Sequence, residues 1–144
     1  MKYILVILFA VFIPSCVISK LLSSKKTPEY YLNQGKRQMA DTDTHEAIKS
    51  FTRAIKLNPN YMDAYMERAK ANLVVDSIIN AIGDYDSVMV RLKPNEYMKM
   101  GELYFLKGDA LFLLGADTIA CRCWRKAKDL NNQTSWDRIR KRCK

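Results

Sequence analysis

Residues 62–95 read MDAYMERAKANLVVDSIINAIGDYDSVMVRLKPN, and this 34-residue stretch decides the fold because its pattern occurs three times in the chain. Its aromatic, small and aromatic positions recur 34 residues earlier and 39 residues later; the three sets are Tyr31, Ala47, Phe51; Tyr65, Ala81, Tyr85; and Tyr104, Ala120, Trp124. Self-similarity at a fixed period of this length indicates a stack of repeated helical units.

Each unit also carries a small residue where two antiparallel helices would cross, namely Gly35, Ala69 and Gly108. An aromatic residue, then Gly or Ala, then Ala, an aromatic residue and Pro at this spacing resembles the tetratricopeptide repeat (TPR). The resemblance covers residues 28–61, 62–95 and 101–134, and it implies an all-α fold, a short α-solenoid of three helix pairs plus a C-terminal capping helix.

The stop and start signals place the individual helices. Thr27-Pro28 is typical of an N-cap followed by Pro in the first turn, and Pro59 and Pro94 follow their helices. We expect Asp43 and Asp76-Ser77 to cap the second helices of repeats one and two. The expected helices are 28–40, 45–57, 62–74, 78–92, 96–114, 118–130 and about 134–143. Five extra residues between repeats two and three, around Pro94 to Met100, predict an extra turn on the fifth helix.

The first 26 residues predict export. Lys2 precedes an uncharged apolar run, and the run ends in Ile13-Pro14-Ser15-Cys16, which resembles the lipobox of bacterial lipoproteins. The resemblance implies a signal peptide over 1–15, a lipid on Cys16, a tether over 16–26 and a TPR domain over 27–144 in the bacterial cell envelope. A single N-terminal transmembrane anchor and simple secretion are the alternatives.

The remaining cysteines suit an oxidising compartment. In the repeat register Cys121 takes a buried position and Cys123 the position of Ser50 and Asp84, which we expect to be exposed. Cys143 ends an apolar stripe on the last helix, so we expect a Cys121–Cys143 disulfide and a free Cys123. The pairing is similar to that of other exported bacterial TPR proteins; two reduced, buried thiols remain the alternative.

The TPR resemblance also implies where a partner binds, since the first helix of each pair lines a concave groove in that family. The implied groove residues are Leu32, Lys36, Met39, Met66, Lys70, Leu73, Phe105, Asp109 and Phe112. An apolar strip flanked by charges suits a peptide or a partner helix, with Phe105 and Phe112 as the expected anchors. These side chains could instead simply pack against neighbouring helices. The chaperone-binding members hold a C-terminal carboxylate with Lys, Asn and Arg, and this set is missing here.

Charge and composition narrow the function further. The formal net charge is +9, and the segment from Arg122 to Lys144 holds nine Lys or Arg against two Asp. That segment could bind anionic lipid or polymer, or be a solvated capping face; we expect no nucleic acid partner because no aromatic platform accompanies it. With His45 as the only histidine and no glycine-rich phosphate loop, we expect no enzyme, no cofactor and no metal site.

Overall fold

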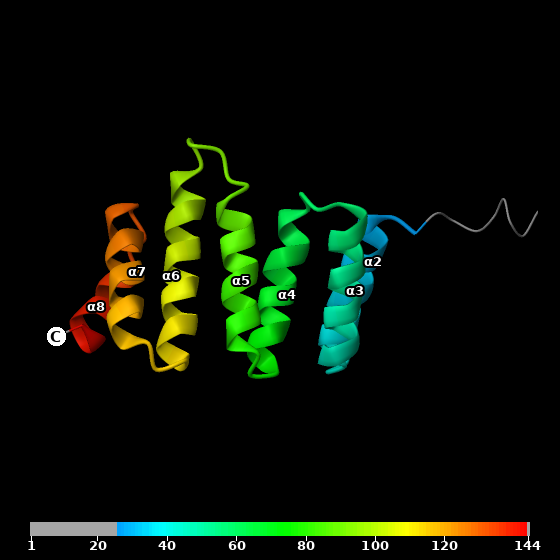
Figure 1. The fold of residues 1–144 in the computed structure, drawn as a ribbon, viewed down its shortest axis with the longest axis horizontal. Helices are drawn as coiled ribbons and strands as arrows, with labels where there is room; N and C mark the ends of the chain where they lie inside the picture. Colours follow the sequence, from blue (N-terminus) through cyan, green and yellow to red (C-terminus); the bar gives the residue numbers. More distant parts are fainter. Residues whose placement is uncertain (1–25, 144) are drawn as a thin grey trace, which may run out of the picture.

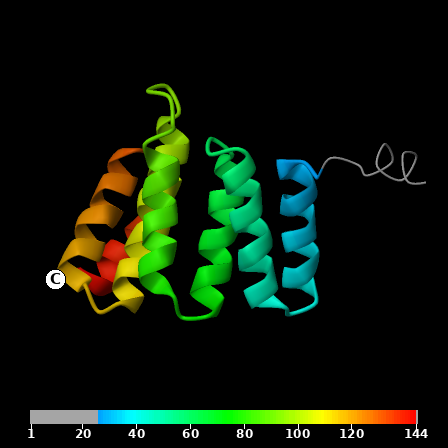
Figure 2. The same cartoon turned by 45° about the vertical axis from the view of Figure 1, so that its right-hand side comes forward.

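The computed structural model describes residues 26–143, and all of its regular secondary structure is helical. The predicted signal peptide, the lipobox and Cys16 lie outside the described residues. The helices are α2 (Pro28–Ala40), α3 (Thr44–Leu57), α4 (Met62–Val74), α5 (Ile78–Met89), α6 (Tyr97–Leu113), α7 (Asp117–Asp129) and α8 (Ser135–Arg142). Consecutive helices are antiparallel neighbours, so the chain forms three hairpins in a row, closed by α8 (Figures 1 and 2).

Each hairpin closes tightly because a small residue lets an aromatic ring of the second helix lie against the first. A Cβ atom added to Gly35 would come within 2.4 Å of the Phe51 ring, and one added to Gly108 within 2.5 Å of the Trp124 ring. Phe51 and Trp124 are fully buried, and Tyr85 is almost so. The recurring small–aromatic pair therefore positions the helices of each repeat, as the period predicts.

The helix boundaries agree closely with the expected ones, and the differences have local causes. Thr27 accepts a hydrogen bond from the backbone N–H of Tyr30, which makes it the predicted N-cap of α2. Asp43 and Ser77 occupy the N-cap positions of α3 and α5, but neither makes a side-chain capping bond, so that part of the prediction is wrong. Helix α5 ends at Met89 rather than at 92, where the chain turns and Arg91 donates to the carbonyl oxygen of Pro59.

The extra residues between repeats two and three lengthen α6, as predicted. It has 17 residues, against 13 in α4 and 13 in α7. In both views the start of α6 and the loop before it extend beyond the ends of the other helices (Figures 1 and 2).

The register prediction of exposure at one position of the second helices is wrong. Ser50, Asp84 and Cys123 are 1%, 4% and 8% exposed, respectively. The reason is that this position faces the first helix of its own repeat: Ser50 donates to Gln38 Oε1 at 2.7 Å, and Asp84 bonds to Asn72 and Arg68. Each repeat thus buries a polar or thiol side chain between its two helices.

Candidate binding surfaces

The residues of the implied groove repeat as a triplet, one on each first helix. Within each triplet they are four and three residues apart, a spacing that places them on one side of the helix. We call the surface of α2, α4 and α6 that carries them the first-helix face. The triplets are Leu32, Lys36, Met39 on α2; Met66, Lys70, Leu73 on α4; and Phe105, Asp109, Phe112 on α6.

Burial differs along this face. Leu32 is 5% exposed and belongs to the main hydrophobic cluster, so it supports the fold and offers no surface to a partner. Met66 and Leu73 are partly buried against the same cluster, and Met39 behaves likewise. Lys36 and Lys70 are exposed. Repeats one and two therefore present a half-buried apolar strip with an exposed lysine at its centre.

A cavity of about 190 Å³ opens between the first helices of repeats two and three. Its floor is apolar and includes Met66 and Leu103, while Asp63, Lys99 and Glu102 stand among its lining residues. An apolar floor with charges beside it is the composition expected of a site for one side chain of a peptide.

The first-helix face is covered differently in repeat three, because α8 reaches over it. Arg138 of α8 donates to both carboxylate oxygens of Asp109, at 2.9 and 3.1 Å. Its guanidinium carbon lies 5.9 Å from the centre of the Phe105 ring, and that of Arg142 lies 4.9 Å from the centre of Phe112. The two aromatic residues expected as anchors are thus partly buried beside arginines, in cation–π contact.

Asp109 of α6 is the residue that hydrogen-bonds to both of the other helices in this region. The same carboxylate accepts a hydrogen bond from Trp124 Nε1 at 3.1 Å, so it ties α6 to α7 as well as to α8. Repeats one and two carry Lys36 and Lys70 at the equivalent position, so among the three triplets only that of repeat three offers a carboxylate to the basic helix that follows α7.

Helix α8 is fastened at both ends. Asn132 Oδ1 accepts hydrogen bonds from the backbone N–H and the hydroxyl of Ser135 at its start. At its far end the structure joins Cys143 to Cys121, the predicted pair, with Cα atoms 5.7 Å apart. Trp136 of α8 is 53% exposed, with the ammonium of Lys128 3.9 Å from its ring centre.

The free cysteine is placed differently from the prediction. Cys123 is unpaired but buried, at the level of the ion pair between Lys107 and Asp86, and burial raises the pKa of its thiol. We therefore expect it to be unreactive in the folded protein rather than the exposed thiol that the register suggested.

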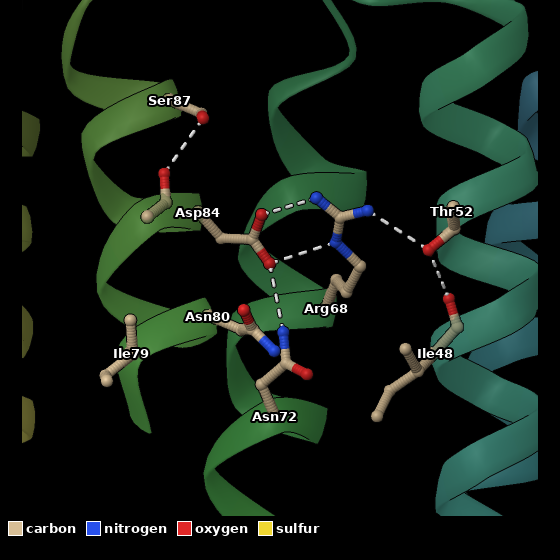
Figure 3. Close-up of a pocket in the computed structure, with 9 residues that line it drawn as sticks. Ile48, Thr52, Arg68, Asn72, Ile79, Asn80, Asp84 and Ser87 are labelled. Carbon is tan, nitrogen blue, oxygen red and sulfur yellow. Dashed lines mark hydrogen bonds and ion pairs between the residues drawn. The ribbon is translucent and has the colours of Figure 1, made fainter. Parts of the chain in front are cut away.

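The opposite surface, formed by α3 and α5, has a wider and more polar cleft of about 490 Å³ with Arg68 of α4 at its floor (Figure 3). The Arg68 guanidinium donates to both oxygens of Asp84, at 3.0 and 2.6 Å, and to the Thr52 hydroxyl at 3.0 Å. Asn72 donates to the same carboxylate at 3.3 Å. Because these partners satisfy one another across three helices, we assign this network to the stability of the stack.

Sequence reasoning missed this pair, although a signal was present. Arg68 stands where the TPR pattern has an apolar residue, and Asp84 follows it by 16 residues, the same interval that separates Gln34 from Ser50 in repeat one. A charge at an apolar repeat position calls for a partner of opposite charge at the facing position.

Two further properties concern the described residues alone. Among residues 26–143 no group of three or more His, Cys, Asp or Glu side chains could hold a metal ion. None of helices α2 to α8 is long and apolar enough to cross a membrane.

Comparison with known proteins identifies the fold. No family model matches the chain. Mouse DnaJ homolog subfamily C member 7 is 26% identical over 115 residues, which is 78% of this chain and 22% of that protein, so the chain spans about a fifth of its length.

Solved structures match most of the chain. The Arabidopsis OM64 TPR domain is 26% identical with a TM-score of 0.66, over 81% of this chain and 96% of that domain. The first TPR domain of Spaghetti (RPAP3), bound to the HSP90 peptide SRMEEVD, is 20% identical with a TM-score of 0.67, over 81% and 90%. The TPR2B domain of yeast Sti1, in a complex with pHsp70, is 24% identical with a TM-score of 0.64, over 79% and 90%. The chain therefore has the fold of a TPR domain, an all-α solenoid of three helix pairs with a capping helix.

Proposed function

We propose that this chain is a non-enzymatic interaction scaffold that holds a peptide or a partner helix on its first-helix face. The observation that carries the proposal is the recurrence of the triplet on α2, α4 and α6. Five of its apolar side chains stay half-buried, namely Met39, Met66, Leu73, Phe105 and Phe112, and its two lysines, Lys36 and Lys70, are exposed. Apolar side chains that stay half-buried, with a charge beside them, provide both contact area and orientation for a bound segment.

The geometry favours repeats two and three as the centre of binding. Met66 lines the cavity between α4 and α6, and Leu73 lies half-buried two turns further along α4. Lys70 lies between them and is exposed, so its ammonium group can contact an approaching chain. At the third repeat Phe105 and Phe112 offer ring surface that the neighbouring arginines leave uncovered.

The comparisons support this class of function without naming the partner. Two of the similar domains are described in complexes, that of Spaghetti with an HSP90 peptide and that of Sti1 with pHsp70. Because this chain lacks the Lys, Asn and Arg set of the chaperone-binding domains, we expect it to recognise a different segment.

A matched pair of charge reversals tests the surface. Lys70 on α4 is 57% exposed and pairs with the carboxylate three residues earlier, while Lys49 on α3 is 63% exposed and pairs with Glu46 in the same way. After native extraction from membranes, Lys70→Glu should reduce the recovery of a co-purifying protein at least fivefold, and Lys49→Glu should leave it unchanged. Equal recovery with both variants, or a loss with Lys49→Glu alone, would place binding elsewhere.

We further propose that a lipid on Cys16 tethers the domain to a bacterial membrane. The support is the lipobox-like tetrad behind an uncharged run, and mass spectrometry of the mature N-terminus tests it. An acylated Cys16 is the expected result; an intact Met1 contradicts it and favours the transmembrane anchor.

A second candidate function is the binding of anionic polymer or lipid through α8. Arg140 is 78% exposed on its side chain, and Lys141 and Arg142 beside it are also exposed. Replacing Arg140 and Lys141 with Gln, which keeps Arg142 on the Phe112 ring, should abolish binding to anionic vesicles or polymer if α8 is the binding surface, and should change only the salt dependence of protein capture if it is not. A purely structural role inside an envelope complex predicts that neither Lys70→Glu nor these changes affect recovery.

A further inference from the structure

The start of α6 is the one place where the repeat period is broken. The extra residues give α6 four residues more than α4, which at 1.5 Å per residue adds about 6 Å to one end of the helix. We call residues 90–99, which run from the end of α5 through the loop to the first turn of α6, the α6 tip. The tip projects beyond the other helices in both views (Figures 1 and 2).

The tip carries apolar side chains that the fold does not use. Val90 is 80% exposed, Tyr97 54% and Met98 72%, and none of them belongs to either hydrophobic cluster of the described residues. Tyr97 and Met98 are consecutive in the first turn of α6, and adjacent exposed apolar side chains are typical of interaction surfaces.

Hydrogen bonds hold the tip in shape. Glu96 accepts from the backbone N–H of Lys93 at 2.9 Å and pairs with Lys99 Nζ at 2.7 Å. The bond from Lys99 is the main reason why the pKa of the Glu96 carboxyl lies below its ordinary value. With that carboxylate engaged, Lys93, Tyr97 and Met98 are among the exposed side chains of the tip.

This composition suits a lipid interface better than a protein groove. Tyrosine is enriched at the boundary between hydrocarbon and headgroups, and lysine reaches from there to anionic headgroups. The position fits as well, because the tip and the start of α2 lie on the same side of the row of helices (Figure 1). Pro28 is 12 residues from Cys16, which allows an extended reach of at most about 40 Å.

We propose that the α6 tip is a second membrane contact, which places Tyr97 and Met98 in the interface of the bilayer that holds Cys16. The inference rests on the proposed tether. Two contacts instead of one would hold the helices upright on the membrane, with the first-helix face turned sideways and accessible to a partner. The turns between the helices of each repeat then point away from the bilayer.

A fluorescent probe on a single new cysteine tests this, with a control of equal exposure. In the full chain, Met98→Cys and Ile79→Cys each receive an NBD label. Both native residues are 72% exposed, but Ile79 lies in the first turn of α5, at the opposite end of the helices from the tip. The unsubstituted chain, treated in the same way, gives the background from the native cysteines. Each labelled protein is mixed with vesicles of phosphatidylethanolamine and phosphatidylglycerol, with and without doxyl-labelled lipid.

We expect NBD emission at position 98 to rise at least twofold with vesicles and to be quenched by doxyl lipid, while emission at position 79 stays unchanged. Flotation of the same samples reports the tether separately. If the chain floats but the two probes behave alike, the tip proposal is wrong and the tether stands. If the chain does not float, the tether is wrong. Quenching at position 98 by an excess of vesicles with doxyl-labelled lipid then still decides whether the tip contacts a bilayer. A response at position 98 to protein concentration, but not to vesicles, assigns the tip to a second copy and overturns the proposal.

Discussion

The ion pair between Arg68 and Asp84 stabilises the stack of helices, and its contribution can be measured by substitution. Asp84 is 4% exposed and accepts three hydrogen bonds, two of them from Arg68 and one from Asn72. Removing one partner of such a buried pair leaves the other charge without compensation. We expect Arg68→Leu, which strands the carboxylate, to lower the free energy of unfolding by about 3–5 kcal/mol.

The opposite single change should cost somewhat less. Asp84→Ser leaves the guanidinium with the Thr52 hydroxyl and some water, because the Arg68 side chain is 22% exposed. We expect a loss of about 3 kcal/mol, at the lower end of the range for buried pairs. In a domain of this size about 1 kcal/mol shifts the melting temperature by roughly 4 °C, so the melting temperature should fall by about 12 °C.

The double variant separates a buried pair from two independent contacts. Arg68→Leu with Asp84→Ser restores the apolar residue of the TPR pattern and leaves a serine, as in repeat one, so we expect stability within about 1 kcal/mol of the unsubstituted protein. Urea unfolding followed by circular dichroism at 222 nm measures all four proteins. Additive losses in the double variant, or single losses below about 1 kcal/mol, would refute the reasoning.

Three further expectations follow from burial. Gly108→Ala should lower the free energy of unfolding by about 1–3 kcal/mol because its methyl group would meet Trp124, whereas Gly83→Ala, with nothing within 4 Å of the new atom, should raise it by about 0.5–1 kcal/mol in urea unfolding. Burial, with two nearby carboxylates, raises the pKa of Tyr85 to about 12. A tyrosine whose folded-state pKa is raised contributes stability below about pH 10 that is lost between about pH 10 and pH 12, up to about 3 kcal/mol. Tyr85→Phe should therefore flatten the fall in stability between about pH 10 and pH 12, and parallel falls in the two proteins would contradict the assignment. Cys123 should react with maleimide only on unfolding, and rapid labelling of the folded, unreduced protein would show that the thiol is accessible.

The fold could be predicted because residues close together in the sequence determine where each helix starts, where it ends and which helix it packs against. Thr27-Pro28 starts α2, Pro59 stops α3, and the small–aromatic spacing fixes which helices cross, so α2 and α4 begin and end at the expected residues. The lengthened α6 was also predictable, since residues added within a helical pattern near its start extend the helix rather than interrupt the stack.

The candidate site was predictable only in position. The spacing places Met66, Lys70 and Leu73 on one side of α4, but it does not determine how deeply Leu32 is buried by its neighbours. The docking of α8 depends on charges that are distant in sequence: Arg138 lies 29 residues after Asp109, and no local pattern connects them. A periodic pattern reports the contacts of equivalent residues and misses those that occur once.

Site-specific photo-cross-linking in cells tests the central claim most directly. A photoreactive amino acid replaces either Lys70, which is 57% exposed on the first-helix face, or Lys49, which is 63% exposed on α3. The scaffold account predicts that position 70 forms a discrete cross-linked band with one partner and that position 49 does not. Cross-links from position 49 alone, or identical band patterns from both positions, would contradict it.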